Sequence, residues 1–268
     1  MYRYFVELAY KGTTYCGWQL QPGHPTIQGK LEDIMRLLLR EPVRLTGAGR
    51  TDSGVHASCF VAHFDSEKEA LHLDTQLLRK INGLAGKDIA IYRIRPVAPN
   101  AHARFDALSR TYLYRIAQTK NPFTVDLACH LYRPLNTAKM NRAAKILLEF
   151  QDFTSFSKLH GDAVTNLCNI TEARWTKKPA TGEIRFTITA NRFLRNMVRA
   201  IVGTMIEIGT EKRPPDDIRR IIEAKNRNAA GTSAPAHGLY LTKIVYPPSL
   251  FTAAGKTVDP PARYNIVR

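Results

Sequence analysis

Cysteine is scarce in this sequence, and its placement excludes two kinds of site. Cys16, Cys59, Cys129 and Cys168 stand far apart, with no C-x-x-C pair and no histidine at the spacing of a zinc ligand. We therefore expect neither a disulfide framework nor a structural zinc site, and no metal is predicted. Unpaired cysteines of this kind fit a protein of the reduced cytosol.

Long hydrophobic runs and a secretion signal are also missing. The longest apolar run, residues 197–208, is about half the length that spans a bilayer and contains Arg199 and Glu207. Residues 2–10 alternate like a β-strand and lack the apolar core of a signal peptide. The sequence thus predicts a cytoplasmic protein without a membrane segment.

Negative charge is in short supply. The 268 residues include 39 Lys and Arg but only 23 Asp and Glu, which gives a formal net charge of +16. Such a field attracts a phosphate backbone and releases its counterions, whereas it would serve a neutral metabolite poorly. The charge favours a polyanionic partner, and a generally basic surface is the simpler alternative.

A glycine-rich segment, residues 47–57, reads G-A-G-R-T-D-S-G-V-H-A but lacks the features of a nucleotide-binding loop. It has no G-K-[ST], and Asp52 interrupts the dinucleotide pattern G-x-G-x-x-G. Its three glycines permit backbone conformations that bring Arg50, Thr51 and Asp52 together. In the alternative, Asp52 caps a backbone N–H in an ordinary turn and Arg50 faces solvent. Spacing alone does not decide between these interpretations.

Hydrophobic periodicity predicts an α+β protein with antiparallel sheets. We expect a domain boundary near residue 108, with an N-terminal domain over 1–108, a C-terminal domain over 109–247 and a tail over 248–268. The expected strands are 2–10, one from Cys59, one from Ile89, 111–117, 167–176, 183–190 and 239–246. The expected helices are one from Thr26 that ends before Pro42, 74–82, 137–148, and long helices from Phe193 and Asp216.

The glycine-rich segment resembles the catalytic motif of pseudouridine synthases of the TruA family, in which the aspartate is catalytic. Further motifs occur in the family's order and cover most of the chain. They are Y-C-G-W-Q at 15–19, H-A-R-F at 102–105, R-T-Y-L-Y at 110–114, D-F-T-S-F at 152–156, F-L-R-N-M-V-R at 193–199 and G-L-Y-L at 238–241. Residues 160–169 and those after Pro248 match no usable pattern. The resemblance implies a pseudouridine synthase fold, with two α/β subdomains around a basic cleft.

The resemblance also implies roles for individual residues. Asp52 would be the catalytic carboxylate, and Arg199, the second arginine of F-L-R-N-M-V-R, would lie against it and keep it ionised. Tyr112 would stack on the flipped base, Arg50 would occupy the space that the base vacates, and Leu239 would line the pocket. The implied substrate is uridine 38, 39 or 40 in the anticodon stem-loop of tRNA, bound by a homodimer.

The reaction itself fits these residue types. Pseudouridine formation breaks the bond from ribose to N1 and rejoins the base through C5, so no atom leaves and no cofactor is expected. A carboxylate can attack the ribose, attack the base or act as the base of an elimination, and the sequence leaves these three routes open. A stacked uridine must first be extracted from its stem, at a cost of a few kcal/mol.

Other polar residues receive structural interpretations. We expect His56, His63 and His102 to be hydrogen-bonding residues rather than general acids, and Trp18 to be a packing residue. In a helix from Phe193, Arg195 would lie one turn before Arg199 on the same face, where it would contact solvent or phosphate.

Two other functions are weighed against the enzyme. A non-catalytic RNA-binding protein would explain the charge but not an acidic residue in a basic, glycine-rich loop. A zinc-dependent base deaminase would require H-x-E and P-C-x-x-C elements, and the sequence has neither.

Overall fold

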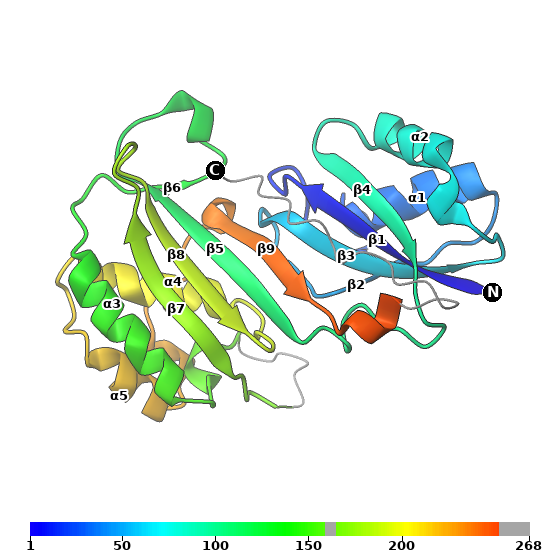
Figure 1. Cartoon of the computed structure of the whole chain (residues 1–268). Helices are drawn as coiled ribbons and strands as arrows, with labels where there is room; N and C mark the ends of the chain where they lie inside the picture. Colours follow the sequence, from blue (N-terminus) through cyan, green and yellow to red (C-terminus); the bar gives the residue numbers. More distant parts are fainter. Residues whose placement is uncertain (159–164, 252–268) are drawn as a thin grey trace. The chain divides into compact units, whose positions relative to one another are not determined.

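The first strand and helix follow directly from the sequence pattern. In the computed structural model, which describes residues 1–158 and 165–251, β1 spans Tyr2–Tyr10 and α1 spans Ile27–Leu39 (Figure 1). Thr26 caps α1 through its Oγ1, which accepts the backbone N–H of Gly29 at 3.2 Å. Arg40, with a left-handed φ of 58°, ends the helix as expected before Pro42.

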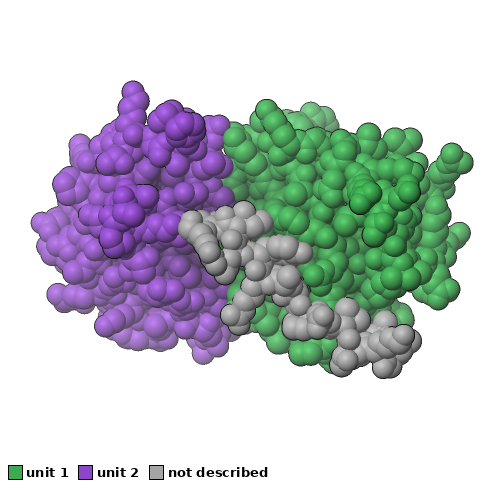
Figure 2. All heavy atoms as spheres, turned by 45° about the horizontal axis from the view of Figure 1, so that its top comes forward, with its two compact units in different colours: residues 1–108, 241–268 green, residues 109–240 purple. Residues whose placement is uncertain are grey.

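Backbone contacts divide the chain into two units, which are coloured in Figure 2. Among the described residues, unit 1 comprises 1–108 and 241–251, and unit 2 comprises 109–240. Residues 241–247, expected in the C-terminal domain, therefore belong with the N-terminal residues. Their contacts explain this, because Val245 accepts the N–H of Leu108 at 2.8 Å and the Tyr246 ring packs on Phe5.

Unit 1 contains an antiparallel sheet. Its strands have the order β4-β1-β3, and the short β2 pairs with β3. Helix α2 packs against β4, and α1 packs against α2 (Figure 1). The remaining bounds in this unit are Thr46–Gly47 for β2, His56–Ser66 for β3, Thr75–Ala85 for α2, Ile89–Pro96 for β4, and the part of β9 (Leu239–Val245) from residue 241 onward.

Unit 2 contains a second set of antiparallel strands, in the order β5-β8-β7, with the short β6 parallel to β5. Helix α3 packs on β7 and on α4, and it also contacts α5 (Figure 1). The bounds are Ser109–Ala117 for β5, Cys129–His130 for β6, Thr137–Ile146 for α3, Ile170–Lys177 for β7, Ile184–Ala190 for β8, Met197–Gly209 for α4 and Asp217–Glu223 for α5. The expected α+β class with antiparallel sheets is confirmed.

The two expected long helices of unit 2 differ from the prediction. Helix α4 begins at Met197 instead of Phe193, because Asn196 has a left-handed φ of 65°. Arg195 therefore precedes the helix and does not share a helical face with Arg199. Helix α5 has only 7 residues, and Lys225, with φ of 46°, follows soon after its end.

Residues 159–164 and 252–268, which include most of the expected tail and part of the segment 160–169, lie outside the described residues. The described beginning of the tail, Pro248–Phe251, is a 3₁₀ turn whose Phe251 is buried. Within 1–158 and 165–251, no helix has the length and apolar character needed to cross a membrane.

Candidate active site

The glycine-rich segment 47–57 is held at both ends by β3. Its start pairs with that strand, since Ala48 donates its N–H to Val61 at 2.8 Å. Its end forms a tight turn in which Val55 donates its N–H to the carbonyl of Asp52 at 3.1 Å. Gly54 has φ of 79° within this turn, a backbone conformation that residues with a Cβ rarely adopt. The turn fixes the backbone of Asp52.

The three glycines have different functions, which refines the expectation that all of them provide backbone freedom. Gly47 is required for packing, because a Cβ there would lie 2.5 Å from Nε1 of Trp18. Gly54 is required for its positive φ. Gly49 has neither constraint, since a Cβ would meet no atom within 4 Å. Trp18 itself is buried, as the packing interpretation predicted.

The segment 15–19 is hydrogen-bonded to the glycine-rich segment. Trp18 donates its backbone N–H to the carbonyl of Thr51 at 3.3 Å, and Ser53 donates its hydroxyl to the carbonyl of Tyr15 at 3.2 Å. Gly17 must be glycine, because a Cβ there would lie 2.2 Å from the carbonyl oxygen of Thr51. The motifs at 15–19 and 47–57 therefore form one structural unit.

Thr51 anchors the loop between the two candidate functional residues. Its side chain is buried, and its Oγ1 forms a hydrogen bond of 2.9 Å with the hydroxyl of Tyr10. Arg50 on one side is exposed, and Asp52 on the other is half-buried. A buried anchor between exposed and half-buried neighbours holds the Asp52 carboxylate at an accessible position. Sequence reasoning did not assign Thr51 this role; its conformity to the family string was the only available signal.

Arg199 lies in the first turn of α4 in unit 2. Its Nε donates to the carbonyl of Ala234 at 2.8 Å, and its own carbonyl accepts the N–H of Ala234 at 2.9 Å. Its positive charge also acts on the buried Tyr114 hydroxyl. Burial raises the pKa of Tyr114, and the Arg199 charge opposes that increase only in part, so this hydroxyl stays protonated.

Tyr112 and Tyr114 of β5 differ in accessibility. Tyr112 is half-buried, and its ring meets the ring of Phe193 edge to face with centroids 5.2 Å apart. Tyr114 is fully buried and donates its hydroxyl to the carbonyl of Pro235 at 2.9 Å. Tyr114 therefore has a structural role, whereas Tyr112 keeps a partly accessible ring.

Leu239, the first residue of β9, is buried. The preceding Gly238 lies directly against the Tyr114 ring, because a Cβ there would lie 2.7 Å from Cζ of Tyr114. Unit 2 thus brings Arg199 and the start of β9 to Tyr114. Arg50 and Asp52 belong to unit 1, whereas Tyr112, Arg199 and Leu239 belong to unit 2.

The three histidines are hydrogen-bond acceptors for backbone groups, as expected. Nδ1 of His56 accepts the N–H of Gly12 at 3.0 Å, and Nδ1 of His63 accepts the N–H of Ala103 at 3.1 Å. Nδ1 of His102 accepts the N–H of Arg104 at 3.1 Å. In the part of the chain that the structure describes, no group of three or more His, Cys, Asp and Glu residues could hold a metal ion.

Comparison with known proteins identifies relatives over nearly the whole chain. The model of a family described as tRNA pseudouridine synthase matches residues 143–247. The chain is 52% identical over 251 residues to tRNA pseudouridine synthase A of Porphyromonas gingivalis, covering 94% of this chain and 100% of the relative. It is 51% identical to the protein of that name from Bacteroides fragilis, covering 93% and 98% of the two chains. The identity to its namesake from Limosilactobacillus reuteri is 38%, with 92% and 97% covered.

Proposed function

Because the chain belongs to the tRNA pseudouridine synthase A family and isomerises uridine to pseudouridine in tRNA, we propose that Asp52 is its catalytic carboxylate. The observation that carries this proposal is the anchoring of the loop. Thr51 is hydrogen-bonded to Tyr10 and Trp18, and Gly54 lies in the turn that follows. The backbone of the loop is therefore fixed, while the Asp52 side chain is half-exposed. A preorganised carboxylate is what a reaction without a cofactor requires.

The chemistry assigned to Asp52 conserves every atom of the substrate. The bond between C1′ and N1 breaks, a bond between C1′ and C5 forms, the proton on C5 is lost, and N1 gains a proton. An ionised carboxylate can act as nucleophile or as base in this sequence. Attack on the ribose, attack on the base and elimination all use the same oxygen atoms, so the assignment of Asp52 does not depend on the route.

Arg199 is proposed to keep Asp52 ionised inside the occupied site. An ion pair at about 4 Å in an effective dielectric near 20 gains roughly 4 kcal/mol before desolvation is counted. The hydrogen bond from Nε to Ala234 supports the proposal, because it fixes the plane of the guanidinium group.

Three residues are proposed to handle the extracted uridine. Tyr112 stacks on the base, and its partly accessible ring supports this role. Arg50, which is exposed beside Asp52, fills the space that the base leaves in the stem. Leu239 lines the pocket, supported by its burial at the start of β9, directly after the Gly238 that packs against the Tyr114 ring.

We further propose that the targets are uridines 38, 39 and 40 of the anticodon stem-loop, and that the active protein is a cytoplasmic homodimer. Site-resolved pseudouridine mapping of tRNA from a deletion strain, with and without the restored gene, tests the targets. Modification lost and regained only at other positions would contradict them. Sedimentation of the active protein at micromolar concentration tests the dimer, which an active monomer would exclude.

A non-catalytic RNA-binding protein is the alternative that the family membership does not favour. The same mapping experiment distinguishes it, because purified wild-type protein should form pseudouridine in a tRNA transcript without any added cofactor. A protein that bound the transcript and left every uridine unchanged would support the alternative.

A further inference from the structure

A short segment of unit 2, residues 230–235, lies directly on helix α4, and we call it the strap. Gly231 donates its N–H to Oγ1 of Thr204 at 2.9 Å. Gly203 allows the close approach, because a Cβ there would lie only 1.8 Å from the carbonyl oxygen of Thr232. At Gly203 the strap backbone therefore contacts the helix without an intervening side chain.

The strap binds Arg199 through two hydrogen bonds at one residue. Ala234 accepts from Nε of Arg199 at 2.8 Å and donates its own N–H to the Arg199 carbonyl at 2.9 Å. Nε lies in the plane of the guanidinium group, so a bond to Nε sets the orientation of that plane. The position of Ala234 consequently determines the direction in which the Arg199 charge points.

Ser233, the residue before Ala234, accepts two side-chain hydrogen bonds. Its Oγ accepts from Nδ2 of Asn196 at 2.6 Å and from Nη2 of Arg227 at 3.0 Å. Asn196 adopts φ of 65° immediately before α4, and its side chain does not cap that helix. Arg227 also donates Nη1 to the carbonyls of Gly231 at 3.1 Å and Ala230 at 3.4 Å, so it contacts the strap at three residues.

We propose that Ser233 is a positioning residue for catalysis: with Asn196 and Arg227 it clamps the strap, and the clamped strap fixes the orientation of the Arg199 guanidinium group, the proposed cationic partner of the catalytic carboxylate. This inference rests on the role proposed above for Arg199. Ser233 acts through Ala234 and Arg199 and has no contact with substrate in this account. The strap thereby links the left-handed Asn196 to the charge that keeps the carboxylate ionised.

The test measures single-turnover pseudouridine formation on a tRNA transcript as a function of pH, with the full-length protein. Ser233→Ala should lower the rate about tenfold and move the acid limb of the profile to higher pH, because the carboxylate loses part of its cationic partner. Binding of the transcript should be unchanged. Ser233→Thr, which keeps the hydroxyl, should restore the wild-type profile.

Two further variants separate positioning from a general structural effect. Thr232→Ala removes an exposed side chain from the same strap and should leave rate and profile unchanged. Asn196→Gly retains access to positive φ but removes the amide donor, and it should reproduce the change caused by Ser233→Ala.

The double variant with Arg199→Gln, which removes the positive charge, decides the pathway of the effect. If Ser233 acts through Arg199, Ser233→Ala should cause no further loss once Arg199 is replaced. A wild-type rate and profile for Ser233→Ala, or a full tenfold loss added to that of Arg199→Gln, would overturn the clamp while the role of Arg199 stands. An Arg199→Gln enzyme with wild-type rate would instead overturn the role of Arg199, and the clamp with it.

Discussion

The two residues that flank Asp52 hold its backbone in place. Thr51 is buried against Tyr10, and Ser53 is bound to the carbonyl of Tyr15, so the residues on either side of Asp52 are fixed. The sequence identified Asp52 through the family motif, but it could not show which neighbour anchors the loop. That information depends on β1 and on the segment 15–19, which approach the loop only in the folded chain.

Tyr112 provides a prediction about stacking. Tyr112→Ala should lower kcat/KM by roughly 10–100-fold, because one stack between a base and an aromatic ring contributes about 1–3 kcal/mol. Tyr112→Phe keeps the ring and should remain within a few-fold of wild type. Single-turnover kinetics on a tRNA transcript measures both variants. Equal losses for Phe and Ala would contradict stacking and assign the role to the hydroxyl group.

His63 provides a prediction about pH. Burial, the neighbouring His102 and Arg3 lower the pKa of His63 to about 4, whereas an unfolded histidine titrates near pH 6.5. As the pH falls, the unfolded chain takes up the proton on this histidine before the folded protein does. The neutral His63 therefore contributes its full stabilisation of the fold above about pH 6.5, and this contribution is lost as the pH falls toward 4. The free energy of unfolding should therefore decrease by roughly 2–3 kcal/mol over this range.

Urea denaturation at several pH values measures this decrease. His63→Asn offers an acceptor in place of Nδ1 without the titration, and it should show a smaller pH dependence than wild type. His24→Asn, at an exposed position, serves as the matched control and should keep the wild-type dependence. A pH dependence of the His63→Asn variant equal to that of wild type would show that His63 does not contribute.

Among the elements, helix boundaries are predicted correctly where a side chain caps the helix, and incorrectly where a left-handed residue interrupts the pattern. Thr26 and Asp74 cap α1 and α2 through their side chains, and hydrophobic periodicity predicts both helices to begin at these residues. The start of α4 could not be predicted, because its boundary is a left-handed Asn196 inside an uninterrupted apolar pattern. The short β2 and β6 were also missed, since two-residue strands carry no periodicity.

Two glycines in helices should respond oppositely to the same substitution. Gly203→Ala places a Cβ 1.8 Å from the carbonyl oxygen of Thr232 and should destabilise the protein by roughly 1–3 kcal/mol, because the strap must move. Gly83→Ala in α2 meets no atom within 4 Å and should stabilise by about 0.5–1 kcal/mol. Thermal or urea unfolding of the pair gives the comparison. A Gly203→Ala variant as stable as Gly83→Ala would contradict the contact between strap and helix.

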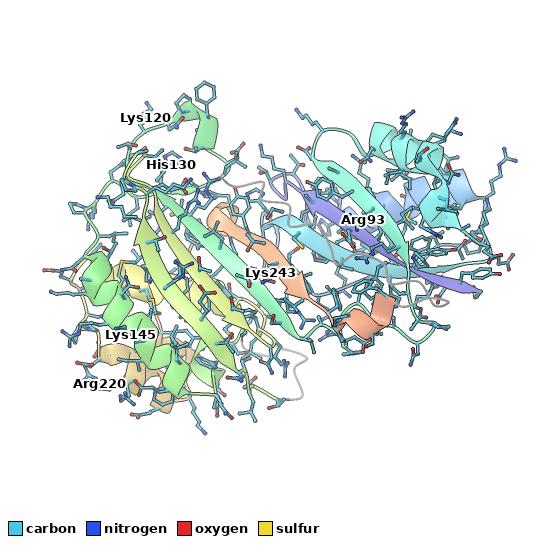
Figure 3. The ribbon with its side chains drawn as sticks, viewed as in Figure 1. Arg93, Lys120, His130, Lys145, Arg220 and Lys243 are labelled. Carbon is cyan, nitrogen blue, oxygen red and sulfur yellow. The ribbon has the colours of Figure 1, made fainter. Side chains whose placement is uncertain are left out.

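At the scale of the whole molecule, positive charge is distributed over many elements. Figure 3 labels Arg93 on β4 and Lys243 on β9, and in unit 2 it labels Lys145 on α3 and Arg220 on α5. The net charge of +16 predicted a polyanionic partner from composition alone, and the family membership supports tRNA as that partner. Composition could not indicate which uridine is modified, because a charged surface recognises phosphates irrespective of base.

Affinity for tRNA should consequently depend steeply on salt. If about 6–10 phosphates are contacted, the association constant should fall by roughly 10³–10⁵ between 50 and 200 mM salt. Fluorescence anisotropy with a labelled transcript measures the slope. The Asp52→Asn variant should show the same slope, because it keeps the basic surface. An affinity independent of salt would contradict electrostatic capture of the RNA.

The central claim concerns Asp52 and is tested most directly by Asp52→Asn with site-resolved pseudouridine mapping on one tRNA transcript. The substitution keeps the size of the side chain but removes its negative charge, and Asp33→Asn on the exposed face of α1 serves as the control. We predict that Asp52→Asn binds the transcript like wild type and forms no detectable pseudouridine, while Asp33→Asn remains fully active. Pseudouridine formed by Asp52→Asn at the wild-type rate would contradict the account.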